Sequence, residues 1–276
     1  MKICELLQIG KKILNNSEEP KIILSSLLNK SIEWLIINSE ILLEDKELIK
    51  NFFKFLLLKK NGVPIEYLTG KKEFFSETIE INRNVLIPRN ETEKLLEVAI
   101  YLIKKEKIKK IIDIGTGSGI IPLVIKKNFP DLEIIATDIN IDTLFVAKKN
   151  LKNLNVNLIL CNVLDAIKGK FDLIISNPPY VKTNHINILP ESVKKYEPKI
   201  AINGGKDGLR FYKEIITKSR SILNRNGLII FEIGYFSHVE ILKKMLLNNN
   251  FYEIEIFRDN LNFPRVIKAK WKEENF

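Results

Sequence analysis

The sequence predicts an α/β protein with a mainly parallel sheet covered by helices on both faces, preceded by a small helical bundle. Apolar residues recur at helical spacing through the first part of the chain. Beyond residue 110, short apolar runs alternate with helical segments, which is typical of parallel strands joined by crossover helices. The 276 residues suffice for one small and one large domain.

The N-terminal domain is expected to span residues 1–70. Asn61-Gly62 ends its last long helix, and Pro64 opposes a restart. The alternating stretch at 71–90 predicts a hairpin-like linker, and 91–276 form the larger domain. The first helix is indicated by apolar residues that share one face: Ile3, Leu6, Leu7, Ile13 and Leu14.

The larger domain should contain a parallel sheet with an antiparallel last strand. The connection from Asp259 to Pro264 is too short for a crossover helix, so the two strands around it should pair antiparallel. Helical segments fill most of the other gaps. The strands are expected near residues 111–114, 133–137, 157–160, 171–176, 227–233, 251–256 and 265–270.

A glycine loop, Gly115-Thr116-Gly117-Ser118-Gly119, follows the first of these strands. Its glycines let the backbone turn tightly and approach a ligand closely. A dinucleotide site needs its third glycine one position later, where Ile120 stands. Asp113 at the loop entry suits a cationic ligand such as S-adenosylmethionine, with its α-amino group and sulfonium, better than a phosphate. A plain glycine turn between strand and helix is the alternative interpretation.

Asp138 ends the second strand of the larger domain. It follows Gly119 at close to the ~20 residues at which an acidic side chain reaches ribose hydroxyls in this type of fold. A carboxylate that accepts from both hydroxyls makes charge-assisted hydrogen bonds. Such an Asp often caps the next helix instead, but Asn140 or Asp142 can do so here. We therefore expect Asp138 to hold a ribose.

The segment Asn177-Pro178-Pro179-Tyr180 follows a buried strand. Pro178 restricts Asn177 to extended geometry, and the two prolines remove two backbone donors. The backbone carbonyls and the Asn177 side-chain oxygen are then acceptors with few competing N–H groups. Two acceptors and one aromatic face suit a planar, neutral amino group awaiting alkylation. A proline-rich loop capped by an Asn turn is the alternative.

Together these elements resemble the class I S-adenosylmethionine-dependent methyltransferases, whose fold is Rossmann-like. The tetrapeptide resembles those that methylate planar amino nitrogens, either adenine N6 of nucleic acid or glutamine N5 of protein. Further segments resemble the release factor glutamine methyltransferase family, although Asn90 stands where that family usually has Pro. These segments are Tyr67-Leu68-Thr69-Gly70, Leu86-Ile87-Pro88-Arg89, Glu91-Thr92-Glu93, Tyr196-Glu197-Pro198, Asn203–Leu209 and Phe231-Glu232-Ile233-Gly234.

The resemblance implies methyl transfer from S-adenosylmethionine to the glutamine of the Gly-Gly-Gln motif in class I peptide-chain release factors. The N-terminal domain would then grip the release factor away from the glutamine. The implied catalytic residues are Asn177, Pro178 and Tyr180. The implied cofactor-binding residues are Asp113, Gly115, Thr116, Gly117, Ser118, Gly119, Asp138, Asn162 and Asn177. The implied substrate-binding residues are Pro88, Arg89, Asn177, Pro178, Pro179 and Tyr180.

Asn162 departs from the family pattern, which usually has Asp in the loop beside the adenine. Asn can still accept a hydrogen bond from an exocyclic amine, so we expect the contact to survive with less charge. Arg89 has a simpler alternative, as a surface salt-bridge partner. Glu232, at the end of a buried strand, can simply satisfy nearby backbone donors.

The formal net charge of +10 suggests a nucleic-acid partner, but the basic residues are mostly Lys and spread along the chain. We therefore expect solvated faces, no stable nucleic-acid complex and a monomer. A weaker alternative is that the basic surface steers the protein toward an acidic partner.

Cysteine usage and hydropathy predict a cytoplasmic protein without a membrane span or a signal peptide. Cys4 and Cys161 form no Cys-x-x-Cys pair and are expected to be reduced thiols. The isolated His185 and His238 suggest no metal site.

Three alternatives to release factor methylation remain open from the sequence. One is a ribosomal-protein glutamine-N5 methyltransferase with the same site. Another is an adenine-N6 enzyme, which needs room for a flipped base and usually a DNA-reading domain. The third is a cofactor-binding interaction module without catalysis.

Overall fold

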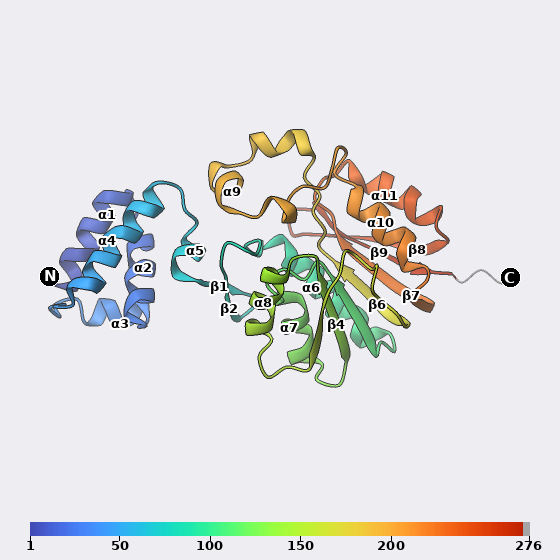
Figure 1. The fold of residues 1–276 in the computed structure, drawn as a ribbon, viewed down its shortest axis with the longest axis horizontal. Coiled ribbons are helices and arrows are strands. Elements are labelled where there is room, and N and C mark those ends of the chain that lie inside the picture. The colour runs from blue at the N-terminus through green and yellow to red at the C-terminus, as the bar shows by residue number, and fades with distance from the viewer. Residues whose placement is uncertain (273–276) are drawn as a thin grey trace. The chain divides into compact units, whose positions relative to one another are not determined.

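A computed structural model describes residues 1–272 and divides the chain into two compact units (Figure 1). One unit comprises Met1–Lys71 and Pro190–Tyr196, and the other comprises Lys72–Leu189 and the chain from Glu197 onward. Residues 273–276, which end the predicted larger domain, lie outside the described residues.

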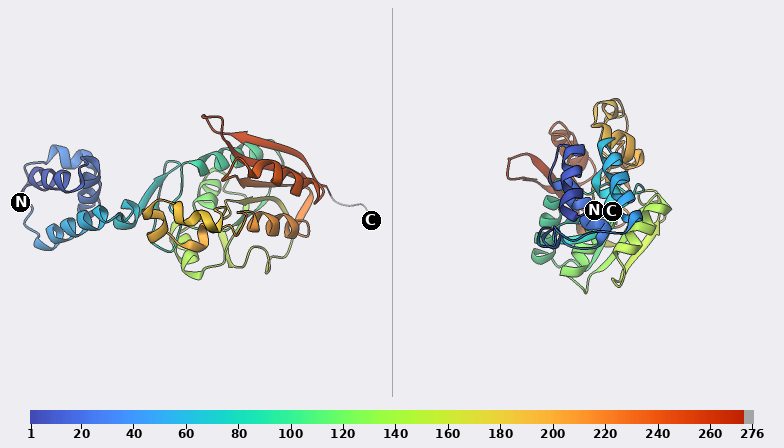
Figure 2. Two further views of the ribbon diagram at one scale, coloured as in Figure 1. Left: turned by 90° about the horizontal axis from the view of Figure 1, so that it is seen from above. Right: turned by 90° about the vertical axis from the view of Figure 1, so that its left-hand side faces the viewer.

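The first unit is helical, as predicted. Helices α1 to α4 pack on one another, as Figure 2 shows in blue. Asp45 begins α4 by accepting from the backbone N–H groups of Glu47 and Leu48. The core is formed by Ile3, Leu6, Ile23, Leu24, Leu35, Phe52 and Leu56. The helices are α1 (Ile3–Leu14), α2 (Glu18–Leu28), α3 (Ile32–Ile37), α4 (Lys46–Lys60), α5 (Ile65–Thr69) and α9 (Glu191–Tyr196).

The second unit contains a seven-stranded sheet in the order β5-β4-β3-β6-β7-β9-β8. Neighbours from β5 through β7 are parallel, whereas β9 is antiparallel to both β7 and β8, so the predicted antiparallel last strand is confirmed. The strands are β3 (Lys110–Ile114), β4 (Glu133–Asp138), β5 (Val156–Leu160), β6 (Phe171–Ser176), β7 (Leu223–Glu232), β8 (Phe251–Arg258) and β9 (Pro264–Trp271).

Helices cover both faces of this sheet. On one face, α6 (Glu91–Lys105), α7 (Ile120–Asn128) and α8 (Ile141–Asn150) pack side by side. On the other, α10 (Arg210–Ser219) and α11 (His238–Leu247) bury apolar residues against the sheet. A separate hairpin, β1 (Lys71–Phe74) and β2 (Glu77–Glu80), precedes α6, and two 3₁₀ helices, η1 (Thr183–Ile188) and η2 (Lys199–Ala201), follow β6. Within residues 1–272, no helix is long and apolar enough to cross a membrane.

The register of the central strands places three loops at one edge of the sheet. Ile114 of β3 pairs with Thr137 of β4 on one side and with Ser176 of β6 on the other. Gly115 and Asn177 therefore leave the sheet at the level of Asp138, the last residue of β4. From β3 the chain runs first to β4, on one side, and later to β6, on the other side. Open α/β sheets form their ligand crevices where the strand order changes direction in this way.

Candidate functional site

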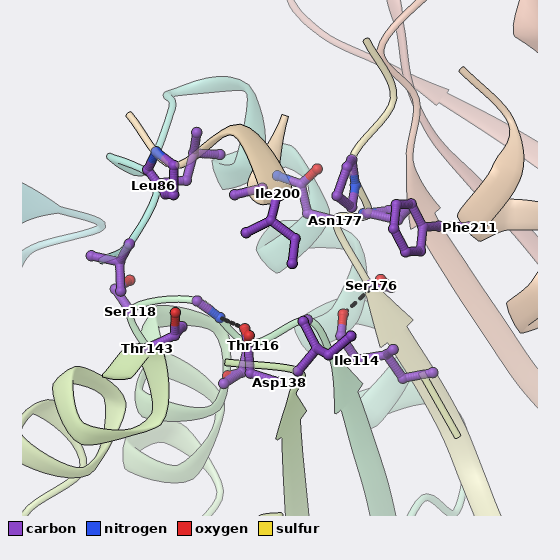
Figure 3. A pocket seen from close by; sticks show the side chains of 18 of the residues that line it. Leu86, Ile114, Thr116, Ser118, Asp138, Thr143, Ser176, Asn177, Ile200 and Phe211 are labelled. Carbon is purple, nitrogen blue, oxygen red and sulfur yellow. Dashed lines mark hydrogen bonds between the residues drawn. The ribbon is translucent and has the colours of Figure 1, made fainter. Parts of the chain in front are cut away.

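A cavity lies at this edge of the sheet, lined by the loops after β3, β4 and β6 (Figure 3). The segment before α6 and the segments at η2 and α10 complete its wall. Eleven of the predicted site residues line it: Pro88, Arg89, Gly115, Thr116, Gly117, Ser118, Asp138, Asn162, Asn177, Pro178 and Pro179. Asp113, Gly119 and Tyr180 are not among the lining residues.

The glycine loop leaves open space above it. Gly115 and Gly117 have φ angles of 72° and 56°, which L side chains rarely adopt. A Cβ built on either residue meets no atom within 4 Å. The two positions therefore form a cradle that a ligand can approach closely.

Gly119 has a different role, because a Cβ there lies 3.2 Å from the Cα of Ala147 in α8. The glycine lets the start of α7 pack against α8, and this explains why it does not line the cavity.

The Asp138 carboxylate ties the glycine loop to the end of β4. It accepts hydrogen bonds from the backbone N–H groups of Gly117, at 3.1 Å, and of Asn140, at 3.1 Å. Asn140 is one of the two residues that the sequence offered as a cap for α8, and its side chain accepts from the Asp142 N–H. Burial raises the pKa of Asp138, and the backbone hydrogen bonds oppose that rise. Because each carboxylate oxygen has two lone pairs, Asp138 can still accept from a ligand in the cavity it lines.

Asp113 lies in β3, two positions before the loop, with 1% of its surface exposed. Neither of its carboxylate oxygens has a hydrogen-bond partner among residues 1–272. Burial raises the pKa of Asp113 to about 7, and the nearby charge of Asp138 raises it further. A buried, unpartnered carboxylate is costly, and a cationic group held nearby reduces that cost.

Asn177 is held through its side-chain nitrogen. Its Nδ2 donates to the Thr92 hydroxyl at 3.1 Å, and that hydroxyl donates to Oε2 of Glu232 at 2.7 Å. The Asn177 Oδ1 atom is thereby left available as an acceptor beside Pro178 and Pro179, which also line the cavity.

Tyr180 packs away from the cavity lining. A Cβ on Gly234 would lie 2.0 Å from Cδ2 of the Tyr180 ring, so only glycine permits this contact. The ring also meets Tyr235 edge to face, with centroids 6.1 Å apart. Burial raises the pKa of the Tyr180 phenol, which keeps it neutral.

Arg89 forms an ion pair with Glu197, whose side chain is buried. The pair joins the segment before α6 to the segment before η2. Arg89 also lines the cavity, so it is both a salt-bridge partner and a wall residue. Asn162 donates from Nδ2 to Asp165 at 3.0 Å, which leaves its Oδ1 atom available as an acceptor at the cavity wall.

Thr92, Glu232 and an apolar wall were not predicted as functional. The wall comes from separate loops and helices and includes Ile139, Val163, Ile200, Phe211 and Ile215. In the sequence, the segments that carry these wall residues show only the amphipathic pattern expected of core packing. Thr92 and Glu232 do have a signal, because both lie in family-like segments and Glu232 interrupts an apolar strand.

Comparisons with known proteins agree with this geometry. Residues 92–205 match the family model described as Methyltransferase small domain. The release factor glutamine methyltransferase of Clostridium acetobutylicum is 38% identical over 259 residues, covering 91% of this chain and 90% of that protein. The one from Aquifex aeolicus is 36% identical and covers 82% of this chain and 81% of that protein. In fold, the chain resembles a methyltransferase from Pyrococcus furiosus, with a TM-score of 0.53, 18% identity and coverage of 81% and 100%.

Proposed function

The chain belongs to the release factor glutamine methyltransferase family, and on that premise we propose the reaction that it performs. It transfers a methyl group from S-adenosylmethionine to the side-chain amide nitrogen, N5, of the Gly-Gly-Gln glutamine in class I peptide-chain release factors. The observation that supports this most directly is Asn177, which is held by its nitrogen so that its oxygen can accept from an amide.

The cavity fits S-adenosylmethionine, the cofactor of this enzyme. The open positions at Gly115 and Gly117 give room for the ligand, and the unpartnered Asp113 carboxylate suits its cationic amino acid end. When bound, the cofactor supplies a methyl group already activated by a sulfonium. The enzyme's residues therefore need only bind, orient and exclude water.

Each predicted cofactor residue has a role in this proposal. Asp138 accepts from the ribose hydroxyls, and Asn162 accepts from the adenine amine. Thr116, Ser118 and Asn177 line the same cavity as the glycines. Gly119 acts indirectly, by letting α7 and α8 pack closely beneath the loop.

On the substrate side, the Asn177 Oδ1 atom and the Pro178 backbone carbonyl each accept one N–H of the glutamine amide. These contacts hold the nitrogen, favour its pyramidalisation and stabilise the positive charge that grows as the methyl group arrives. No general base is required, because the methylated nitrogen is strongly acidic and loses its proton afterwards. Pro88, Arg89 and Pro179 form walls of the substrate site, and Tyr180 supports the loop from outside the cavity lining through its contact with Gly234.

The helical N-terminal domain, residues 1–70, selects the release factor, and the catalytic domain, residues 91–276, is completed by Pro88 and Arg89 of the 71–90 linker. This division makes one Gly-Gly-Gln loop the preferred substrate among many exposed glutamines. The enzyme acts as a cytoplasmic monomer and forms no stable complex with nucleic acid.

Gly117→Ala is expected to weaken S-adenosylmethionine binding, because its methyl group enters the space above the loop. Gly169→Ala is the matched control. Both glycines have positive φ, of 56° and 100°, and neither has an atom within 4 Å of a built Cβ, but only Gly117 lines the cavity. Calorimetric titration should show a raised Kd for Gly117→Ala alone, with similar small losses of thermal stability in both variants.

The proposed reaction is tested by methyl transfer from labelled S-adenosylmethionine to competing acceptors. The acceptors are a class I release factor, the same factor with its Gly-Gly-Gln glutamine replaced, ribosomal proteins, and DNA. Label on the unmodified release factor alone supports the proposal. Label on ribosomal protein or on DNA identifies the corresponding alternative and overturns it.

A further inference from the structure

We propose that Thr92 and Glu232 are positioning residues. They orient the Asn177 side-chain amide so that its oxygen, and not its nitrogen, faces the substrate amide. The inference rests on the proposed function, because it concerns the residue that holds the glutamine nitrogen. It gives a function to the buried Glu232 carboxylate, which makes none of the proposed contacts with cofactor or substrate.

The chain of hydrogen bonds joins three separate elements. Asn177 follows β6, Thr92 lies in the first turn of α6, and Glu232 ends β7. Asn177 Nδ2 donates to Thr92 Oγ1 at 3.1 Å, and Thr92 Oγ1 donates to Glu232 Oε2 at 2.7 Å. Thr92 and Glu232 are 4% and 1% exposed, so water does not compete well for these contacts.

The direction of the chain follows from what each group can donate. An ionised carboxylate only accepts, so Glu232 takes the one hydroxyl proton of Thr92. The Thr92 oxygen can then only accept from Asn177, which must present its NH₂ group. The opposite end of Asn177, its carbonyl oxygen, is therefore directed away from Thr92 and can accept from the substrate amide. Without this chain, the two nearly isosteric ends of the side chain could exchange.

Protonation of Glu232 weakens this control, because a carboxylic acid can donate as well as accept. Burial raises the pKa of Glu232 to about 7, and the hydrogen bond from Thr92 opposes that rise. Glu91 at the start of α6 raises the pKa further, whereas Arg265 of β9 lowers it. Two phenols also face the carboxyl group, those of Tyr180 and Tyr212, and both stay neutral.

The sign of the pH dependence follows. Below about pH 7, Glu232 holds its proton and Thr92 can point either way; above it, the carboxylate fixes Thr92. We expect kcat to rise as pH increases through this value.

Thr92→Val removes the hydroxyl while keeping the shape of the side chain, and Thr92→Ser retains the hydroxyl. Thr92→Val is expected to lower kcat roughly 10- to 100-fold, as for loss of a hydrogen bond to a charged group. KM for the release factor and Kd for S-adenosylmethionine should stay near wild type, and Thr92→Ser should recover most of the rate. A wild-type kcat in Thr92→Val, or a serine variant as slow as the valine variant, would overturn the proposal.

Glu232→Gln tests the pH dependence, because glutamine can donate and accept at every pH. Its kcat is expected to be low and nearly independent of pH, whereas the wild-type rate rises through about pH 7. A pH step that persists unchanged in Glu232→Gln would contradict the role of this carboxyl group.

A substrate-free measurement separates this inference from the proposed reaction. The side-chain NH₂ resonances of Asn177, followed by NMR against pH, should titrate in the wild-type protein and not in Glu232→Gln. This holds even if the wild-type protein fails to methylate release factor, in which case the proposed function alone fails. Asn177 resonances that do not respond to pH, or that titrate in both proteins, would refute the hydrogen-bond chain.

Discussion

Asn177→Ala is expected to lower kcat for methyl transfer by at least roughly 10²- to 10³-fold, the range for losing one preorganised polar group at a reacting centre. The variant removes the oxygen that accepts from the glutamine amide and the nitrogen that donates to Thr92. S-adenosylmethionine affinity should change little, because the glycine loop and Asp138 provide most of the cofactor contacts. Single-turnover rates and calorimetric titration measure the two quantities separately.

Asn249→Ala is the matched control for Asn177→Ala. Asn249 also donates one hydrogen bond through its side-chain nitrogen, to the Met245 carbonyl at 2.8 Å, but it lies outside the cavity lining. It should retain the wild-type kcat. Retained turnover in Asn177→Ala would contradict the proposed hydrogen bond between Asn177 and the glutamine amide.

Asp138→Ala should raise the Kd for S-adenosylmethionine by roughly 10- to 100-fold, because hydrogen bonds to a charged group contribute about 1.5–3 kcal/mol. Two losses add here. The ribose hydroxyls lose their acceptor, and the glycine loop loses the carboxylate that holds Gly117 N–H at 3.1 Å. At saturating cofactor, kcat should remain close to wild type, since Asn177 and Pro178 are untouched.

Asp142→Ala controls for the loss of a carboxylate at the start of α8, where Asp142 lies in the first turn and is exposed. Its cofactor Kd should be unchanged in calorimetry. Thermal denaturation of both variants would show whether a change in affinity merely reflects unfolding. A wild-type Kd in Asp138→Ala would exclude the ribose role of this residue.

Local sequence patterns predicted most of the fold. The apolar runs at β3, β4 and β6 were visible because buried parallel strands read as continuous apolar segments. The short connection between β8 and β9 was enough to predict their antiparallel pairing, since no crossover helix fits. The sequence could not predict that β9 inserts between β7 and β8, because strand order depends on packing between distant segments.

The candidate site was predictable where its residues lie at a strand end or just after one, as Gly117, Asp138 and Asn177 do. Contacts between distant segments were not. Thr92 and Glu232 are 140 positions apart in sequence, and their hydrogen bond exists only because α6 packs beside the end of β7. The contact between Tyr180 and Gly234 was equally unpredictable, because nothing in the sequence around either residue indicates that the two pack together.

The most direct test of the central claim is fragmentation mass spectrometry of a class I release factor after incubation with the enzyme and S-adenosylmethionine. The account predicts one added methyl group, located on the side-chain amide nitrogen of the Gly-Gly-Gln glutamine and absent when Asn177→Ala replaces the wild-type enzyme. A methyl group on another residue, or an unmodified release factor with cofactor binding intact, would contradict the account.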